Sequence, residues 1–277
     1  MEKQKMFSIL IPCYNTEKYV KDCIESVLKQ NVDDCEILCL DDGSSDKTRE
    51  ILKTYKNNSK VKIFFSRHVG VSQARNKLLK RAKGKYLVFL DSDDLMYDNF
   101  LKNLYDYALN NEFDCHVGSF VHVQDDENLT VTREDIANPD GFNGKSQEEV
   151  FDHMFYERCI YAMCRFIVRN EIVKRNKIYF KKNIVHEDED WVTKILLFCE
   201  KFCCLDCIQF LYRRRKDSIT TSPNTFNYVS KLKIAIDLFN LSEKYTGYKK
   251  KHLIRKVYKI CKELHYITKE IINQEEV

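Results

Sequence analysis

Acidic residues follow an apolar run in the first third of the sequence, at a point where carboxylates can bind a cation. Asp91-Ser92-Asp93 comes directly after the run 86–90 and forms an Asp-x-Asp pattern. Such carboxylates hold Mg²⁺ or Mn²⁺, hard ions that bridge to substrate phosphates and neutralise charge on a diphosphate leaving group. A solvated turn that caps a helix is the alternative interpretation of this motif on its own.

Two further acidic segments can act on a nucleotide or on an acceptor. Asp41 and Asp42 follow the run 35–40, where a carboxylate can accept hydrogen bonds from a base N–H or a ribose hydroxyl, although this sequence also favours a turn. Residues 187–190 (Glu-Asp-Glu-Asp) open a predicted helix, and one of them can serve as a general base. The ordinary preference for acidic residues in a first helical turn explains the same cluster without function.

Basic and aromatic side chains add to this set. The run 213–216 (Arg-Arg-Arg-Lys) can bind a diphosphate or form a solvated basic loop. Arg75 lies near the start of a predicted helix, a position that favours phosphate. Trp191, the only tryptophan, can stack on a sugar ring or pack in the core, and packing is the simpler interpretation.

Alternating strands and helices must position these residues. Strands are expected at 7–12, 35–40, 61–65, 86–90 and near 115–123, and helices at 16–30, 46–55, 72–82 and 98–110. This alternation predicts a mainly parallel sheet with right-handed crossovers. Since ligands bind outside the carboxyl ends of such strands, we expect the segments after the first, second and fourth strands to meet in one crevice.

The remainder of the chain is less regular. Residues 124–146 are polar and predict a surface excursion, and helices are expected over 147–174, from 186 to about 201 and from about 226 onward, with strands near 165–168 and 205–212.

Composition excludes several classes of protein. The formal net charge of +4, from 46 basic and 42 acidic residues, argues against a dedicated nucleic-acid binder. Glycine-rich loops of dinucleotide enzymes and P-loop NTPases do not occur, nor does the Gly-x-Ser-x-Gly elbow of α/β-hydrolases. The twelve cysteines lie mostly in apolar runs with no signal peptide before them, so we expect free thiols in a reducing cytoplasm.

Taken together, these motifs resemble glycosyltransferase family 2, which has the GT-A fold. The matching segments cover about residues 6–222 and include Ser8-Ile-Leu-Ile-Pro-Cys-Tyr-Asn-Thr-Glu-Lys-Tyr19, Cys23-Ile-Glu-Ser-Val-Leu-Lys-Gln30, Leu40-Asp-Asp-Gly-Ser-Ser-Asp46, Gly70-Val-Ser-Gln-Ala-Arg-Asn76, Gly84-Lys-Tyr-Leu-Val-Phe-Leu-Asp-Ser-Asp-Asp94, His186-Glu-Asp188 and Tyr212-Arg-Arg-Arg-Lys-Asp-Ser-Ile-Thr220. The resemblance implies an α/β fold with a Rossmann-like, mainly parallel sheet and flanking helices. It also implies an inverting transfer from a nucleotide-diphosphate sugar, without a covalent sugar–enzyme intermediate.

The resemblance further implies roles for the matching residues. On the nucleotide-sugar side stand Pro12, Tyr14, Asp41, Asp42, Arg75, Asp91 and Ser92, with Asp41 facing the base edge, and the metal ligand for Mn²⁺ or Mg²⁺ is Asp93. The catalytic base is Asp188, because the family has an aromatic residue three positions after its Glu-Asp pair and Trp191 fits that spacing; Asp190 is the fallback. The acceptor or diphosphate side comprises Glu187, Trp191, Arg213 and Arg215.

This assignment predicts a transferase domain at 1–222, with a nucleotide-sugar half (1–112) and an acceptor or catalytic half (113–222). The expected donor is a UDP-sugar, the acceptor is a glycan or a lipid-linked saccharide, and no nucleic acid takes part. A non-catalytic sugar-nucleotide-binding subunit is one alternative, but an intact candidate base argues against it. A metal-dependent nucleotidyltransferase is another, but the first strand lacks a glycine-rich loop after it.

The segment 223–277 predicts a helical extension. Its basic residues flank an apolar stripe, which is typical of an amphipathic helix. The stripe comprises Ile254, Val257, Cys261, Leu264, Ile267 and Ile271. Such a helix either lies on the inner face of the cell membrane as a peripheral contact or packs on the main domain, and packing is the favoured interpretation.

Overall fold

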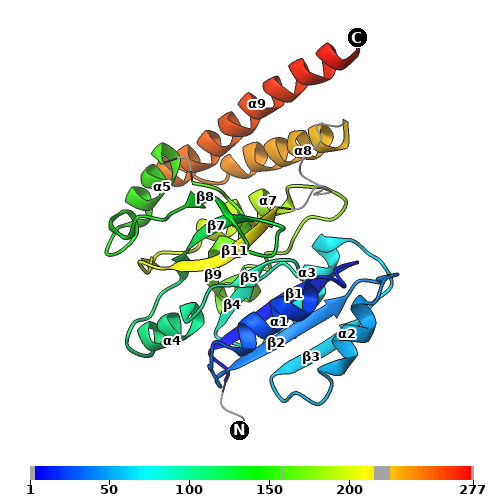
Figure 1. The fold of residues 1–277 in the computed structure, drawn as a ribbon. Coiled ribbons are helices and arrows are strands. Elements are labelled where there is room, and N and C mark those ends of the chain that lie inside the picture. Colours follow the sequence, from blue (N-terminus) through cyan, green and yellow to red (C-terminus); the bar gives the residue numbers. More distant parts are fainter. Residues whose placement is uncertain (1–3, 158, 215–224, 276–277) are drawn as a thin grey trace.

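Seven strands form the larger of two sheets, in the order β10-β6-β9-β4-β1-β2-β3, and the smaller sheet has the order β5-β11-β7-β8 (Figure 1). The computed structural model of the chain describes residues 4–157, 159–214 and 225–275. Its strands are β1 (Phe7–Cys13), β2 (Cys35–Asp41), β3 (Val61–Phe65), β4 (Tyr86–Phe89), β5 (Leu95–Met96), β6 (Cys115–Val117), β7 (Ser119–Gln124), β8 (Val131–Asp135), β9 (Phe166–Arg169), β10 (Phe202–Cys203) and β11 (Ile208–Arg214). Its α-helices are α1 (Val20–Leu28), α2 (Thr48–Thr54), α3 (Val71–Arg81), α4 (Phe100–Asn110), α5 (Gln147–Tyr156), α6 (Asn170–Arg175), α7 (Glu187–Leu196), α8 (Thr225–Ser242) and α9 (Gly247–Glu275).

The centre of the larger sheet is parallel, as the sequence predicts. β1 pairs in parallel with β2 and β4, and β2 pairs in parallel with β3. Every residue of β1 and β2 is buried, which is the pattern of parallel strands covered on both faces. β9 is antiparallel to both β4 and β6, which it joins. The α/β class with a mainly parallel sheet is therefore confirmed.

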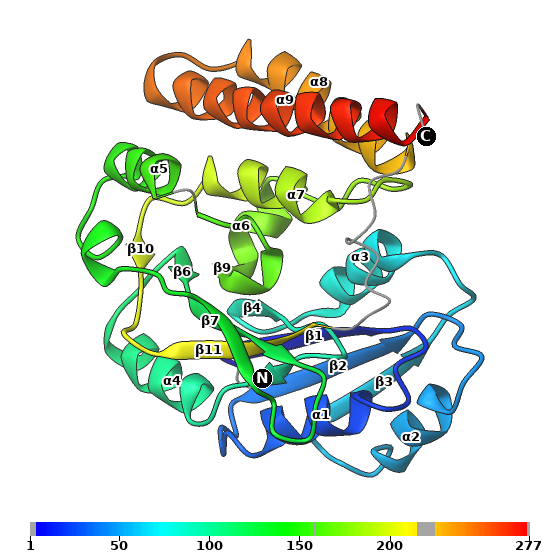
Figure 2. The ribbon, with the colours of Figure 1, turned by 45° about the horizontal axis from the view of Figure 1, so that its top comes forward.

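Helices cover both faces of this sheet. Figure 2 shows α1 and α2 on one face of β1–β3 and α3 on the other. α1 buries Val20, Cys23, Ile24 and Val27, a spacing that places all four on one helical face. The strand ends are thus held by helices on both sides.

The strand expected near 115–123 is divided between the two sheets. β6 joins the larger sheet and β7 the smaller one, with Gly118 between them. A Cβ at Gly118 would lie only 1.7 Å from Gln209 Oε1, so any larger residue here would have to displace the Gln209 side chain of β11. The expected halves 1–112 and 113–222 both contribute strands to both sheets, and their boundary at 222 lies outside the described residues. The surface excursion at 124–146 contains the mostly exposed strand β8.

The C-terminal helices α8 and α9 lie side by side above α7 (Figure 2). A second apolar core joins them to the end of α7, and it includes Ile234, Leu238, Leu253, Ile260 and Leu197. From the predicted stripe, Leu264 is buried and Val257 packs against this core, whereas Ile254 is 37% exposed. The packing interpretation accounts for these residues, and membrane contact stays a prediction. Among the described residues, no helix is both long and apolar enough to span a bilayer.

All twelve cysteines are free thiols. All but two of them are buried; Cys207 is half-buried and Cys261 is exposed on α9. The buried cysteines pack as small apolar side chains, as their place in the sequence predicts.

Candidate active site

The carboxyl ends of β1, β2 and β4 lie at one edge of the larger sheet. Cys13 is the register partner of Asp41, and Leu10 pairs with Phe89 of β4. Because the three strands are parallel, the segments that follow them leave the sheet at this same edge. We call this edge, together with the start of α7, the strand-end site.

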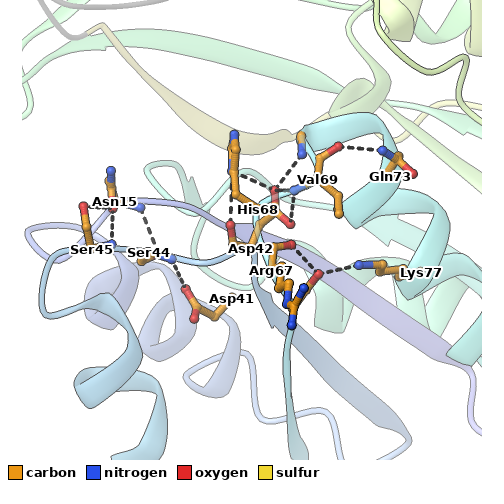
Figure 3. Close-up of polar contacts among 12 residues, drawn as sticks. Asn15, Asp41, Asp42, Ser44, Ser45, Arg67, His68, Val69, Gln73 and Lys77 are labelled. Atoms are coloured by element: carbon orange, nitrogen blue, oxygen red, sulfur yellow. Dashed lines mark hydrogen bonds and ion pairs between the residues drawn. The ribbon is translucent and has the colours of Figure 1, made fainter.

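The segments after β1 and β2 are joined by polar contacts (Figure 3). Asn15, with φ at 51°, accepts a hydrogen bond from the Ser45 backbone N–H at 2.8 Å, and its own N–H donates to Ser44 Oγ at 3.0 Å. Gly43 has a φ of +80°, and a Cβ on it would lie 2.7 Å from the His68 backbone nitrogen. Only glycine suits that left-handed position at such a close approach. The turn after β2 therefore depends on glycine at position 43.

The two acids after β2 are closed off from solvent. Asp41 is 0% exposed and accepts hydrogen bonds from the Ser44 N–H at 3.0 Å and from Arg49 Nε at 2.8 Å. Asp42 is 2% exposed and accepts from the backbone N–H groups of Val69 and Gly70 (Figure 3). This burial differs from the ligand-facing Asp41 that the resemblance implies. Each acid instead fixes a loop, because its oxygens already have partners within the chain.

Two exposed rings, Tyr14 and His68, lie next to the turns that hold Asp41 and Asp42. Tyr14 is 47% exposed and lies against His68, with ring centroids 4.2 Å apart and planes inclined by 30°. The predicted residues Pro12 and Ser92 are both buried. A planar base can stack on such an aromatic surface, so Tyr14 and His68 are the accessible candidates for base contact.

Arg75 joins the Asp-x-Asp motif to the Glu-Asp helix. Its Nη2 donates to Asp91 Oδ1 at 2.8 Å, and its Nη1 donates to Glu187 Oε1. The Arg75 side chain is only 6% exposed, whereas that of Asp91 is 32% exposed. The end of β4 and the start of α7, almost one hundred residues apart in sequence, therefore belong to one site.

A second arginine, Arg213 of β11, also contacts the acidic motif. The backbone N–H of Arg213 donates to Asp94 Oδ1 at 2.9 Å, and its Nε donates to the carbonyl of Asp93 at 3.0 Å. Its Nη1 pairs with Asp125 at 3.1 Å. Arg213 thus braces the motif, with a side chain only 9% exposed. Arg215, predicted on the same side, lies outside the described residues.

Asp188 follows Glu187 in the first turn of α7, next to the Arg75 ion pairs. It is half-buried, and its Oδ1 accepts the Glu189 N–H at 2.9 Å. Burial, and then the negative charges of Glu187 and Glu189, raise the pKa of Asp188 to about 7, against the opposing charge of Arg75. A carboxylate with its pKa near neutrality can accept a proton from a hydroxyl group and later release it.

Two predicted residues of α7 do not face this site. Asp190 is 0% exposed and pairs with Lys194 at 2.7 Å, one turn along the helix. Trp191 is 0% exposed, stacked 4.9 Å from the Phe180 ring centroid and edge-on to Phe89. The acceptor-side role of Trp191 is therefore corrected to core packing, since no face of its ring is open to a sugar. Asp190 lies two residues, about 200° of helical turn, from Asp188.

The C-terminal helices hold the remaining acid of α7. Glu189 pairs with Lys231 of α8 at 2.9 Å and with Lys256 of α9 at 2.7 Å. Burial alone would raise the pKa of Glu189, but the two ammonium groups outweigh it and hold the pKa well below its usual range. The helix that carries Asp188 is thus fixed from behind by both C-terminal helices.

The oxygen donors of the motif suit a divalent cation. Asp94 is 1% exposed, and its Oδ2 has no partner within residues 4–157, 159–214 and 225–275. Burial together with Asp93 and Asp91 raises its pKa well above the ordinary value. This local excess of negative charge would be relieved by a cation. No group of three His, Cys, Asp or Glu in the described part of the chain is arranged to hold a metal. The two carboxylates of Asp91 and Asp93 are still enough for Mg²⁺ or Mn²⁺, because these ions keep several waters and take further oxygens from substrate phosphates.

Comparison with known families decides the assignment of this fold and motif set. The profile of glycosyl transferase family 2 matches residues 8–173, more than half of the chain. The chain belongs to glycosyl transferase family 2.

Relatives of this family 2 chain span bacteria and archaea. An uncharacterised glycosyltransferase of Methanocaldococcus jannaschii is 30% identical over 91% of this chain and 83% of its own length. The uncharacterised glycosyltransferase EpsJ of Bacillus subtilis is 28% identical over 79% of this chain, which spans only 64% of that relative.

Solved structures share the family 2 fold. Residues 1–349 of Staphylococcus aureus TarS in complex with UDP-GlcNAc match with a TM-score of 0.66 and 24% identity, over 85% of this chain and 67% of that one. A mannosyltransferase of Pyrobaculum calidifontis in complex with GDP-Man and Mn²⁺ matches with a TM-score of 0.58 and 15% identity, over 93% of this chain and 70% of that one.

Several residues that contact or support the strand-end site were not selected from the sequence. Asp94 and His68 directly follow or closely follow strands, and that position was the signal available for them. Lys231 and Lys256 contact α7 only because two helices far along the chain fold over it. No local pattern marks such a contact.

Proposed function

We propose that this chain is an inverting glycosyltransferase that moves a hexose or N-acetylhexosamine from a UDP-sugar to a hydroxyl group of a glycan or lipid-linked acceptor. Membership of glycosyl transferase family 2 supports the reaction class. The bound UDP-GlcNAc of TarS supports a UDP-sugar as donor. The first half of the chain would bind the donor, and residues 113–222 would supply the base and the acceptor contacts.

The observation that carries this proposal is the double ion pair of Arg75. It links Asp91, in the motif expected near the donor phosphates, to Glu187, the neighbour of Asp188. A donor bound at the motif and an acceptor whose hydroxyl group faces the base on α7 would therefore meet in one site. In-line displacement needs both groups in one site, because the base and the leaving group lie on opposite sides of the anomeric carbon.

Each residue then has a defined task. Asp188 removes the proton of the attacking hydroxyl as the new glycosidic bond forms and the bond to the nucleoside diphosphate breaks. Arg75 keeps Asp91 and the start of α7 in register, and Tyr14 with His68 offers a stacking surface to the base. A divalent ion at Asp93 and Asp91, when bound, supplies charge neutralisation for the departing diphosphate. The Mn²⁺ of the Pyrobaculum structure supports this choice of ion.

Thermal unfolding with nucleotide sugars tests the proposal. A ligand that binds only the folded state raises the melting temperature, so we expect UDP-GlcNAc or UDP-glucose to raise it in the presence of Mn²⁺. Asp93→Asn should lose the Mn²⁺-dependent part of this increase, and it should no longer release UDP when an acceptor is added. The matched control is Asp98→Asn, an exposed acid outside the motif, which should behave as the unchanged protein.

Two outcomes contradict the proposal. If no nucleotide sugar raises the melting temperature with Mn²⁺, the donor assignment is wrong. If the protein binds a UDP-sugar but never releases UDP with a panel of glycan acceptors, the non-catalytic subunit becomes the better interpretation. The cytoplasmic location and the peripheral membrane contact stay predictions from the sequence.

A further inference from the structure

A cavity of about 470 Å³ lies between α5 and α9, away from the strand-end site. Its wall consists of residues 154–156, Tyr161 and the face of α9 from His252 to Lys262, and we call it the α5–α9 cavity. No residue of the strand-end site lines it. Its volume falls in the range of roughly 300–1,000 Å³ that is common for small-ligand sites. The proposed transferase chemistry does not account for it.

The cavity carries more positive than negative charge. Arg255 pairs with Asp152, and Lys256 pairs with Glu189. Lys259 and Lys262 also line the cavity, and neither has an ion-pair partner within 4 Å in the described part of the chain. Burial lowers the pKa of Lys259, and the charge of Lys256 lowers it further. An anion would satisfy both free ammonium groups.

Aromatic rings lie beside these cations. Lys256 Nζ is 4.1 Å from the Tyr161 ring centroid, and Lys262 Nζ is 4.9 Å from that of Tyr258. Arg255 lies over the Tyr156 ring and Lys262 over the Tyr258 ring, but Tyr258 is 53% exposed and Tyr156 is 67% exposed, so part of each ring is accessible to a ligand. The C–H face of a pyranose packs on such rings, while its hydroxyl groups reach polar side chains. A bare inorganic ion would leave these rings unused.

A buried imidazole provides one more unused contact. His252 lines the cavity and is 3% exposed, and its Nε2 has no hydrogen-bond partner among the residues that the structure describes. It stacks on Phe151 with ring centroids 3.8 Å apart. Burial lowers the pKa of His252 to about 3, so the imidazole is neutral and can exchange one hydrogen bond with a sugar hydroxyl. A buried polar atom without a partner is costly unless a ligand or water completes it.

We propose that the α5–α9 cavity binds a phosphorylated saccharide, with the phosphate on Lys259 and Lys262 and the sugar ring against the tyrosines. The free ammonium groups, the open rings and the unpartnered His252 each match one part of such a molecule. The proposal concerns binding alone and does not depend on turnover at the strand-end site.

Calorimetric titration with glucose 6-phosphate tests this proposal. We expect saturable binding that weakens with added salt, and at least about tenfold weaker binding of methyl glucoside and of inorganic phosphate, each of which lacks one half of the ligand. The double variant Lys259→Ala/Lys262→Ala should lose at least about tenfold in affinity. Lys250→Ala is the matched control, because Lys250 lies on the same helix, pairs with Glu243 and does not line the cavity.

The proposal is wrong if glucose 6-phosphate does not bind, binds equally well to the double variant, or binds no better than inorganic phosphate. Titration of Asp93→Asn protein separates the two sites, since the cavity should keep its affinity when the proposed metal ligand is removed. Binding that disappears in Asp93→Asn belongs to the strand-end site. Binding only to vesicles of phosphatidylglycerol would assign the lysines to a membrane surface and reject the saccharide.

Discussion

Two acidic regions at the same edge of the sheet differ in how their charges are satisfied. After β2, the carboxylates of Asp41 and Asp42 accept hydrogen bonds from backbone N–H groups and from Arg49. After β4, one oxygen of Asp94 has no partner in the described part of the chain. Burial and neighbouring acids raise the pKa of Asp94, and they also raise the pKa of Asp188 at the start of α7. The carboxylates of the first region have their hydrogen-bond partners within the chain. The acids of the second region carry more negative charge than Arg75 and Arg213 can balance.

The difference separates positioning from chemistry. Carboxylates with full sets of partners hold loops in one conformation, and they change little when a ligand arrives. Carboxylates that lack positive charge favour a proton or a metal ion, and perturbed acids of this kind occur frequently at functional sites. We therefore assign loop positioning to Asp41 and Asp42, and the reaction to the acids around Arg75.

The largest expected effect tests the chemical region. Asp188→Asn should lower kcat by about 10³-fold, within the range of roughly 10²–10⁴ for a general base, and leave donor affinity nearly unchanged. UDP release with an acceptor measures kcat, and thermal shift measures donor binding. Asp190→Asn is the control, because Asp190 pairs with Lys194 inside the helix. Equal losses of kcat in both variants would contradict the assignment of the base.

The next effect compares one arginine from each region. Arg75→Gln leaves Asp91 and Glu187 unpaired, so we expect the free energy of unfolding to fall by about 3 kcal/mol, as for other broken buried pairs. Arg49→Gln should cost less than Arg75→Gln, because the Arg49 side chain is 43% exposed and the buried Asp41 keeps the hydrogen bond from the Ser44 N–H. Urea unfolding curves measure both. Similar losses would mean that the two regions do not differ in electrostatic stabilisation.

The raised pKa of Asp188 predicts opposite pH trends for stability and activity. An ordinary aspartate has a pKa of about 3.9, so between about pH 4 and pH 7 the folded protein keeps a proton that the unfolded chain releases. Its contribution to stability therefore falls as pH rises through this window, while kcat rises by about tenfold per pH unit until Asp188 is ionised.

Stability curves with and without Asp188→Asn, measured in metal-free buffer, isolate this trend. The variant should show a smaller fall in stability between pH 4 and pH 7. A kcat that is flat from pH 5 to pH 8 would rule out Asp188 as a base with a raised pKa.

The smallest effect concerns the nucleotide side. Tyr14→Ala should weaken UDP-sugar binding by about fivefold, near the low end of roughly 1–3 kcal/mol for base–aromatic stacking, without changing kcat. Tyr266→Ala is the control, since Tyr266 is exposed on α9. Titration with UDP measures the affinity. If Tyr14→Ala changed kcat but not the affinity for UDP, the ring would act near the acceptor. The assignment of Tyr14 to base contact would then be wrong.

The sequence predicts the strands well because buried parallel strands are continuous apolar runs. The runs 7–12, 35–40 and 61–65 match β1, β2 and β3 to within one residue at each end. The insertion of β9 between β4 and β6 could not be predicted in the same way, because antiparallel pairing across more than fifty residues has no local pattern. The close approach of Gln209 to Gly118, between β6 and β7, is likewise a contact that forms only in the fold.

The site shows the same limit. Spacing selects Asp93 and Asp188 as candidates, and in the structure Asp188 directly follows Glu187, which pairs with Arg75. Spacing also selects Trp191, which proves to be a core residue, since a tryptophan that packs and one that binds sugar look alike in sequence. Which oxygens of Asp41 are already occupied depends on Arg49 and on the turn at Ser44, and composition alone does not reveal it.

The single exposed thiol of the chain offers a practical consequence. Cys261 lies on α9 next to Lys262, whereas the other cysteines are buried or half-buried. A thiol-reactive fluorophore should therefore attach first at Cys261, because access limits the rate of alkylation at the rest. A dye at that position would lie on α9 outside the set of residues that line the α5–α9 cavity, so it would label the protein without any engineered cysteine and without occupying the cavity.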